Sequence, residues 1–429
     1  MRRAAMLLLA VAASATGCDW REFDNLQAST PVLAVDAPSG YPSSSDFASL
    51  LIATQPPSDG SAAARFLTSG TLQTGVTVVT LSPSGSPSKH LVTSPILNGL
   101  SGQPVTAMAA VPGTDKVLLG VPSHYQGTVL TLDLAASNDT VTPFAGINAS
   151  IAAEPMAGVG LAVGDVAGTT AADYVVLSGS ALHLFVDGAS TDLAVGPSAG
   201  CPITFANSLT LRDKIQRAVV IGKLTGAGSV IAVGTPASGA PGTVSFFGVD
   251  SGGALSCLFS LTAPVSSLAE FGRSLAIGDF DGDGVSDLLV GAPPSNAYLY
   301  RGPIAAGATP AGTFTNPASG GYTGASVAAL NLDGKAGDEA LVGDPDGIGN
   351  TQQAGTGDVV QVSGATLSTV AATLADNGGG SNEAYGSSVA ALPFCAAPPC
   401  AQPSLLPLVG AASKAFVYFT LSGTDPRVK

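Results

Sequence analysis

A short pattern recurs seven times along the chain, and this repetition constrains the fold more than any other feature of the sequence. Each copy is an apolar, β-type run that ends in a small residue, usually with proline two places on. The copies are LLIATQPP (50–57), KVLLGVP (116–122), DYVVLSG (173–179), SVIAVGTP (229–236), DLLVGAP (287–293), EALVGDP (339–345) and LLPLVGAA (405–412). Their spacings are 66, 57, 57, 57, 52 and 67 residues, a regularity typical of repeat proteins.

Each copy lies between two further β-type segments. The upstream segments are rich in Ala and Gly: TPVLAVD (30–36), PVTAMAAV (104–111), GVGLAVGD (158–165), RAVVIGK (217–223), GRSLAIGD (272–279), GASVAALN (324–331) and GSSVAALP (386–393). The downstream segments alternate more and carry Phe and Tyr: GVTVVTL (75–81), GTVLTLDL (127–134), SALHLFVDG (180–188), GTVSFFGVD (242–250), NAYLYRG (296–302), GDVVQVSG (357–364) and KAFVYFTLSG (414–423). The rest of each unit has room for one outer strand, such as residues 255–263. No comparable length shows the period of an amphipathic helix.

About four short strands in roughly 50–60 residues are typical of one propeller blade. Innermost strands crowd around the axis and need small residues, whereas the strands farther out accept larger ones. The sequence therefore predicts an all-β, seven-bladed β-propeller over residues 30–429, with blades of about four antiparallel strands. A solenoid is the alternative, but it needs polar capping repeats, and neither terminal unit has that character.

The last unit supplies three strands and then ends at Lys429 with no obvious fourth. An open sheet edge invites aggregation, so a propeller has to close its ring. We expect residues 21–27 to form the outer strand of the last blade. The alternative is a flexible tether after Cys18.

The first 17 residues have the layout of a secretory signal, with two arginines, an apolar run from Ala4 to Ala13 and small residues after it. The end of this segment resembles a bacterial lipoprotein cleavage box, in which Cys18 becomes the lipidated first residue. This resemblance implies an exported protein held at a membrane of the cell envelope through lipid on Cys18, with residues 18–29 as the tether. Ordinary cleavage after Ala15 is the alternative and would leave a secreted or periplasmic soluble protein.

Charge excludes one class of partner. The chain carries 16 Lys+Arg against 30 Asp+Glu, a formal net charge of −14, and only 11% of its residues are charged. A nucleic acid would be repelled rather than gathered by such a surface. We therefore expect no nucleic-acid binding.

Four cysteines remain after Cys18, which permits two disulfides in an exported chain. Cys395 and Cys400 bracket the segment AAPP and would staple a local loop. Cys201 and Cys257 would then pair by elimination. Their similar places in successive units can also hold them too far apart for a disulfide, which would leave two buried free thiols.

The segment DFDGDGVSD carries the clearest chemistry. Asp279, Asp281, Asp283 and Asp287 follow one another at i, i+2, i+4 and i+8, with two glycines that permit a sharp turn. These acids and the backbone carbonyl of Val285 match positions 1, 3, 5, 7 and 9 of a calcium loop, and Ca²⁺ takes six to eight oxygen ligands. The spacing predicts a structural Ca²⁺ site on a hairpin. A solvated acidic turn is the alternative.

Residues 271–293, FGRSLAIGDFDGDGVSDLLVGAP, resemble an FG-GAP repeat of the integrin α-subunit propeller. The resemblance is specific in this unit and weaker in the others. It implies a propeller of FG-GAP type with Asp279, Asp281, Asp283, Val285 and Asp287 as the metal ligands. It further implies that partners bind the upper face, opposite the calcium loop.

The sixth unit contains a weaker version of this loop. Asn331, Asp333 and Glu339 persist there, but Lys335 stands where the third acid belongs. These three residues are the candidates for a second metal loop. In the seventh unit, the segment from Cys395 to Cys400 replaces the loop.

No catalytic residues emerge from the sequence. The three histidines, His90, His124 and His183, lie in different units without metal-ligand spacing. We expect a non-catalytic binding, adhesion or scaffold module that meets an unidentified protein or polysaccharide through its upper face. The alternative is a polysaccharide lyase or hydrolase, because propellers can host such enzymes.

Overall fold

The structure is a computed structural model, which describes residues 32–419 with internal gaps. The gaps are 42–46, 58–59, 61, 71–74, 101–102, 123–126, 136–138, 145–153, 155, 170, 180, 189–191, 204–217, 227, 238–239, 269, 317–321, 333, 346–355, 364–365, 376–383 and 396–402. The expected signal segment 1–17 and the expected tether 18–29, with Cys18, therefore lie outside the described residues. In the described part of the chain, no helix has the length and apolar character needed to cross a membrane.

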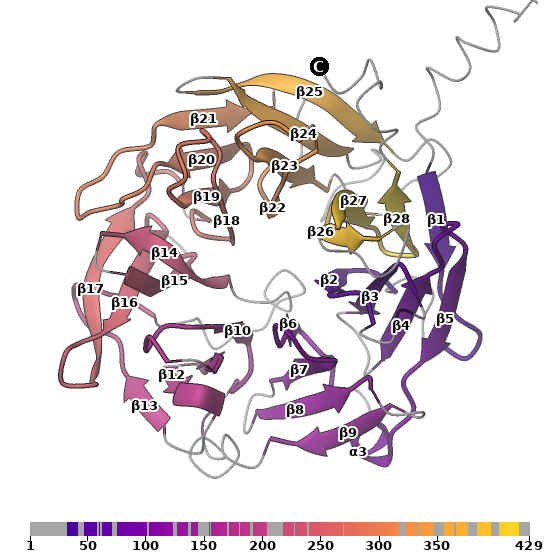
Figure 1. Cartoon of the computed structure of the whole chain (residues 1–429). Helices are drawn as coiled ribbons and strands as arrows, with labels where there is room; N and C mark the ends of the chain where they lie inside the picture. Colours follow the sequence, from indigo (N-terminus) through magenta and orange to yellow (C-terminus); the bar gives the residue numbers. More distant parts are fainter. Residues whose placement is uncertain are drawn as a thin grey trace, which may run out of the picture.

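The described strands pair into seven antiparallel sheets of four strands each, which we number blades 1 to 7 (Figure 1). The strands of each blade are given from the axis outward. Blade 1 consists of β2 (Leu50–Thr54), β3 (Ala64–Ser69), β4 (Val76–Leu81) and β5 (Pro87–Leu91), and blade 2 of β6 (Ala107–Ala110), β7 (Lys116–Val121), β8 (Thr128–Asp133) and β9 (Thr140–Pro143). Blade 3 consists of β10 (Gly160–Gly164), β11 (Asp173–Leu177), β12 (Leu182–Phe185) and β13 (Asp192–Val195). Blades 4 and 5 are β14 (Val219–Thr225), β15 (Gly228–Thr235), β16 (Thr243–Val249), β17 (Leu255–Thr262); and β18 (Ser274–Gly278), β19 (Asp287–Ala292), β20 (Asn296–Tyr300), β21 (Gly312–Thr315). Blades 6 and 7 are β22 (Ser326–Leu330), β23 (Glu339–Asp344), β24 (Thr356–Ser363), β25 (Thr366–Ala375); and β26 (Ser388–Phe394), β27 (Ser404–Gly410), β28 (Lys414–Tyr418), β1 (Val32–Asp36). Two short helical segments, α3 (Pro95–Gly99) and η2 (Val186–Gly188), lie outside the sheets.

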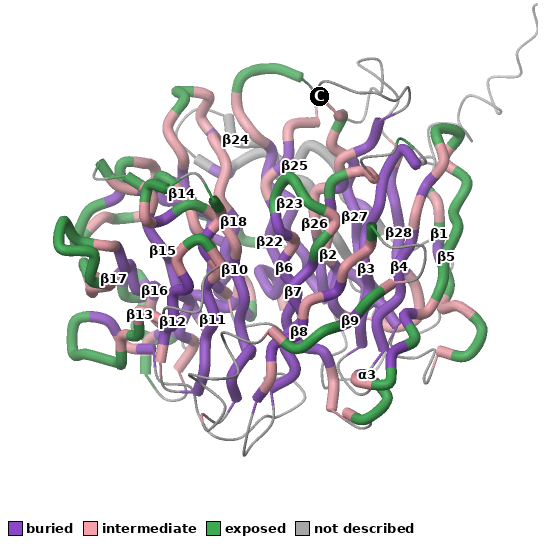
Figure 2. Tube along the Cα trace, turned by 60° about the horizontal axis from the view of Figure 1, so that its bottom comes forward, coloured by how far each residue is buried: buried purple, intermediate pink, exposed green. Residues whose placement is uncertain are grey.

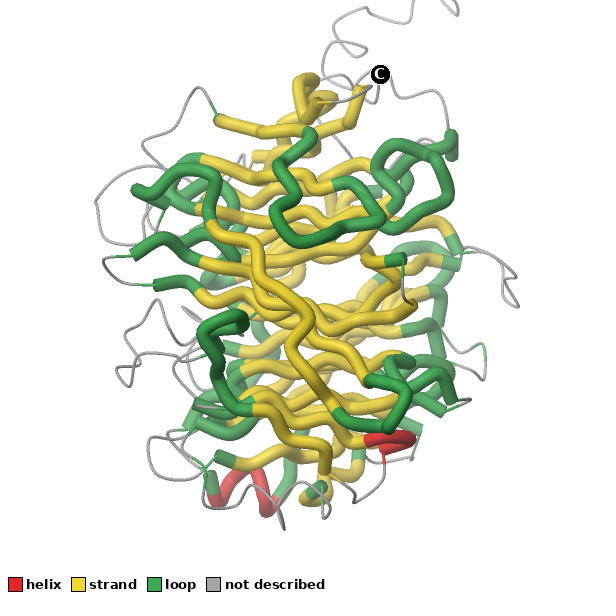
Figure 3. Tube along the Cα trace, turned by 90° about the vertical axis from the view of Figure 1, so that its left-hand side faces the viewer, coloured by secondary structure: helices red, strands yellow, loops and turns green. Residues whose placement is uncertain are grey.

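The innermost strands contact one another in the order β2, β6, β10, β14, β18, β22 and β26, and β26 contacts β2 again. The sheets therefore form a closed circle, which Figure 1 shows along its axis. The strands run between two faces on which the hairpin loops gather (Figure 3). The predicted all-β propeller with four-stranded antiparallel blades is confirmed.

The prediction for the first unit is wrong by one strand. Residues 32–36 form β1, the outermost strand of blade 7, where Val32 pairs with Tyr418 and Asp36 with Lys414. Residues 50–54 form the innermost strand of blade 1, and its second strand is β3. The recurring pattern did not identify β3 as a second strand, because β3 has Ser69 at the position where the second strands of most blades have glycine.

The strand that closes the ring is therefore β1. The segment proposed for this role, residues 21–27, lies outside the described residues. The burial of β1 is typical of an outermost strand. Only Val35 of β1 is buried, whereas all six residues of β3, a second strand, are buried. An outermost strand packs with one face only and leaves the other to solvent.

Aromatic and aliphatic side chains fill the space between neighbouring blades. One cluster joins Phe246 of blade 4 to Phe271, Tyr298 and Tyr300 of blade 5, all of them buried. Figure 2 shows that buried positions follow the strands while exposed positions lie mainly in the loops and outer strands. Burying a large apolar side chain contributes about 1.5–3 kcal/mol, so these layers stabilise the ring blade against blade.

The cysteines divide into a bonded pair and a free thiol. Cys201 and Cys257 form a disulfide with their Cα atoms 5.9 Å apart, and the bond ties residues near the end of blade 3 to the outer strand of blade 4. Cys395 differs from its prediction, because it carries a buried free thiol at the end of β26. Its backbone N–H donates to the Ala63 carbonyl across the interface with blade 1. Cys400 lies outside the described residues.

Candidate metal centre

The candidate site is the loop that joins β18 to β19 in blade 5. Gly278, the last residue of β18, pairs with Asp287, the first residue of β19, so the eight residues between them form the hairpin loop. Gly282 and Gly284 have φ of +74° and +84°. Glycine adopts such values without strain. The two residues let the chain turn sharply enough for loop N–H groups to reach carboxylates of the same loop.

Three of the predicted ligands converge within this loop. Asp279, Asp281 and Asp283 each offer a carboxylate oxygen within 4.8 Å of the others. The loop backbone holds them in place, because Asp283 N donates to Asp279 Oδ1 at 3.1 Å and to Asp281 Oδ1 at 3.2 Å. Gly284 N donates to Asp279 Oδ2 at 2.9 Å. The side chains are half-buried or exposed, so the triad opens to solvent and could hold a hard divalent cation.

Asp287 lies apart from the triad, buried at the base of the loop. Its Oδ2 accepts from Phe280 N at 3.0 Å and its Oδ1 from Gly302 N at 2.9 Å. Burial is the main reason that the pKa of this carboxyl is raised to about 6, and the charges of Asp281 and Asp283 add to the effect. A cation beside the loop would favour the ionised form.

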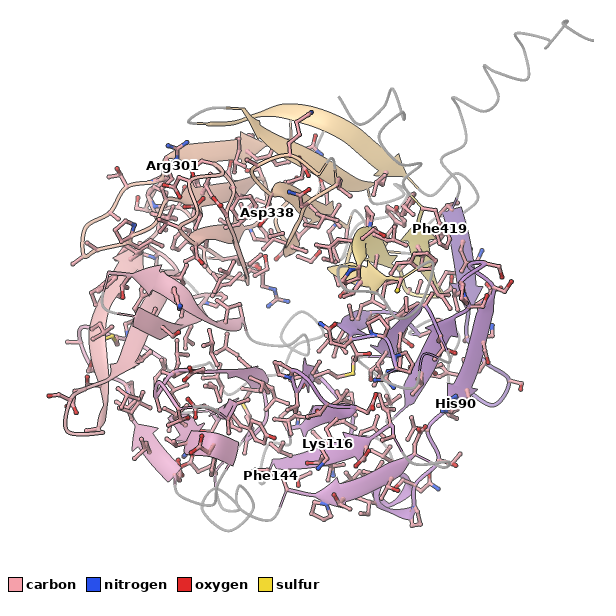
Figure 4. All side chains as sticks on the ribbon, viewed as in Figure 1. His90, Lys116, Phe144, Arg301, Asp338 and Phe419 are labelled. Carbon is pink, nitrogen blue, oxygen red and sulfur yellow. A yellow bond between two sulfur atoms is a disulfide. The ribbon has the colours of Figure 1, made fainter. Side chains whose placement is uncertain are left out.

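Two residues outside the motif contact the loop. Arg301 follows β20, and its Nη1 lies 3.1 Å from Asp281 Oδ2. Asp338 comes from the corresponding loop of blade 6: its Oδ2 accepts from Asp279 N at 2.9 Å, and its N–H donates to the Asp279 carbonyl at 2.7 Å. Figure 4 labels Arg301 and Asp338 in the neighbouring blades 5 and 6. The motif pattern contained no signal for either contact, because both partners lie well outside the loop in sequence.

The weaker loop of blade 6 bonds to itself. Asn331 Nδ2 donates to the Lys335 carbonyl at 2.6 Å, and Asn331 Oδ1 accepts from Gly334 N at 2.7 Å. Glu339 is buried, and its Oε2 accepts from Leu332 N at 2.7 Å. Asp333 lies outside the described residues. Within the described residues, these side chains form no acidic cluster like that of blade 5.

One stretch of the chain, which includes the acidic loop, matches a known protein family. Residues 271–326 match the model of the FG-GAP repeat, and this range contains β18 to β21 with the acidic loop. The matched stretch is one blade and the start of the next. A search of the curated proteins finds no match for the chain.

Proposed function

We propose that this chain is an exported, calcium-stabilised propeller that serves as a non-catalytic binding or scaffold module at the cell envelope. The convergence of Asp279, Asp281 and Asp283 carries the metal part of the proposal. The donor set fits calcium, which prefers carboxylate and carbonyl oxygens in a flexible arrangement. The match of residues 271–326 to the FG-GAP repeat supports the same assignment.

In this proposal Asp279, Asp281 and Asp283 hold the ion together with the Val285 carbonyl, and Asp287, which lies apart from the triad, contributes its negative charge at the base of the loop. A bound calcium ion would supply positive charge that offsets repulsion among the acids. The chain itself orients the ligands, because the backbone N–H groups of Asp283 and Gly284 donate to the carboxylate of Asp279. The proposed role is to stiffen blade 5 rather than to contact a partner.

We further propose that all seven blades are of FG-GAP type, although one matches the family model. A recurring inter-blade contact supports this. Gly291 at the end of β19 lies against the Gly324 carbonyl of the next blade, and Gly343 lies in the same way against the Gly386 carbonyl. Gly120 with Gly158, and Gly234 with Gly272, repeat the arrangement.

Calcium stabilisation is tested by thermal unfolding with calcium and with EGTA. We expect about 10 mM calcium to stabilise the wild-type ring by about 2 kcal/mol, because a ligand stabilises the state that binds it. Asp281→Asn should abolish this difference. Asp250→Asn is the matched control, because it removes the same charge from an exposed turn of blade 4. An identical wild-type melt under both conditions would refute the metal assignment.

The envelope location rests on the proposed lipid at Cys18. The signal-like layout of residues 1–17 supports it. We expect Cys18→Ser to move the protein from the membrane fraction to the soluble exported fraction, because the acyl chains supply the anchoring energy. Wild-type protein that is soluble after export would show cleavage without lipidation.

A non-catalytic role is proposed because no catalytic motif stands out in the sequence and the acidic triad fits an ion that stiffens the loop. A protein or polysaccharide partner would meet the face opposite the acidic loop. Pull-down from envelope extracts with the purified ring tests this, with the calcium-free ring as the comparison.

A further inference from the structure

Arg301 lies beside the acidic loop on a segment that contacts two of its carboxylates. Its guanidinium is 3.1 Å from Asp281 Oδ2. The next residue, Gly302, donates its backbone N–H to Asp287 Oδ1 at 2.9 Å. Arg301 is 35% exposed and Asp281 13%, so this ion pair is partly sheltered from water. Its attraction is therefore screened less than that of a fully exposed pair.

The backbone at Arg301 is held beside the acidic loop by the packing of the next residue, Gly302. A Cβ atom on Gly302 would overlap the Ser286 carbonyl and crowd the Val285 side chain, so the chain at this point lies directly against the loop. From this backbone position the Arg301 side chain reaches Asp281. An arginine also stays charged at every pH at which the protein is folded.

We infer that Arg301 is a built-in counter-cation of the acidic loop, which weakens calcium binding and holds the loop together when calcium is absent. This inference rests on the proposed calcium site. The guanidinium occupies one oxygen of Asp281 and leaves Oδ1 facing Asp283, so an ion in the triad must share Asp281 with a positive charge. Two cations on one carboxylate repel each other, and the repulsion lowers the affinity for the second.

The same positive charge that weakens calcium binding stabilises the loop when no calcium is bound. Four aspartates without any cation would repel one another, and Arg301 offsets part of that repulsion through Asp281. The loop would therefore fold without calcium and fill only where calcium is plentiful. The expected dissociation constant is about 10⁻⁴–10⁻³ M, as in extracellular calcium modules.

The test measures calcium affinity by titration calorimetry and melting temperature with EGTA, for wild type, Arg301→Gln and Arg301→Met. The Met variant keeps the aliphatic stem and its packing, so it covers the case in which Gln impairs folding. We expect both to bind calcium about tenfold more tightly than wild type, with the gain shrinking at high salt. We also expect both to melt at lower temperature than wild type in EGTA.

Two controls separate charge from position. Arg301→Lys keeps the positive charge and should bind calcium within about twofold of wild type. Lys116→Gln removes the same charge from an exposed residue of blade 2, far from Arg301 in Figure 4, and should change neither quantity.

The outcomes distinguish this inference from the proposal beneath it. If wild type binds calcium and the Gln and Met variants bind no more tightly, the counter-cation role is refuted and the calcium site stands. Weaker binding by these variants would likewise refute it and show that Arg301 orients Asp281. If no protein in the series binds calcium, the site itself fails and the inference with it.

Discussion

At Gly343 there is room for a hydrogen atom and nothing larger. A Cβ atom there would overlap the Gly386 carbonyl oxygen and the Ser326 hydroxyl. Both groups are fixed by other contacts, because Ser326 Oγ donates to the Gly386 carbonyl at 2.9 Å and Gly386 N donates to the Gly410 carbonyl at 2.9 Å. The regular glycines of the sequence pattern therefore mark the places where neighbouring blades touch through their backbones.

A substitution at this contact should loosen two blades. We expect Gly343→Ala to lower the free energy of unfolding by about 2–3 kcal/mol, because the added methyl forces the backbones of blades 6 and 7 apart. Denaturant unfolding measures the change. Gly226→Ala is the matched control, since no atom lies within 4 Å of a Cβ built there, and it should stay within about 0.5 kcal/mol of wild type. Equal effects at the two positions would contradict the close-contact explanation.

At the scale of the element, the hairpin between the first two strands has an equivalent position in several blades. The residue paired with the last residue of the inner strand is Arg65 in blade 1, Asp173 in blade 3, Asp287 in blade 5 and Glu339 in blade 6. The three acids all accept backbone N–H groups of their own loop. An acid at this position therefore organises the hairpin in all three blades.

Blade 3 shows this bonding of the hairpin acid to the backbone most fully. Asp173 is buried and accepts from Val166 N, Ala167 N and Asp187 N, each at 2.8 Å. Three N–H donors stabilise the carboxylate without a cation. The triad of blade 5, rather than the acid at the base of its hairpin, is what distinguishes it as a metal candidate.

Blade 1 uses the opposite charge at this position. Arg65 Nη2 lies 2.5 Å from Asp115 Oδ1 in the first hairpin of blade 2, and Arg65 Nε donates to Thr54 Oγ1 at 3.0 Å. Both charged side chains are largely buried. The side chain at this position thus bonds to the neighbouring blade and to Thr54 of its own blade, so the same structural position serves a second purpose.

At the scale of the whole molecule, the ring closes because β1, the first described strand of the chain, pairs with β28, the last. Val35 is 2% exposed and packs in a cluster with Val417 and Phe394 of blade 7. Val32, on the same strand, is 46% exposed. One strand therefore offers a buried and an exposed position for the same substitution.

We expect Val35→Asp to destabilise the ring by about 3 kcal/mol or more, because it places an unpaired charge between buried apolar groups. Val32→Asp should change the stability by less than about 0.5 kcal/mol. Hydrogen exchange of the β28 amides would report opening at this seam before global unfolding. Equal exchange in the two variants would argue that β1 does not close the ring.

The sequence by itself determined what depends on neighbours along the chain. The repeat period and the alternation of strands predict a propeller, because each blade is built from consecutive hairpins whose residue pairs are close in sequence. The spacing of Asp279, Asp281 and Asp283 predicts a shared site for the same reason: a tight turn brings alternate side chains together.

The tertiary structure decided what depends on residues far apart. Nothing local to residues 32–36 says that they pair with residues 414–418, because the pairing depends on the ring bringing its two ends together. The bond between Cys201 and Cys257, and the contacts of Arg301 and Asp338 with the acidic loop, also join residues far apart in sequence, but through packing within a blade or between adjacent blades. Closure of the circle sets the β1–β28 pairing, and packing within and between neighbouring blades sets the other distances. A linear pattern carries no measure of them.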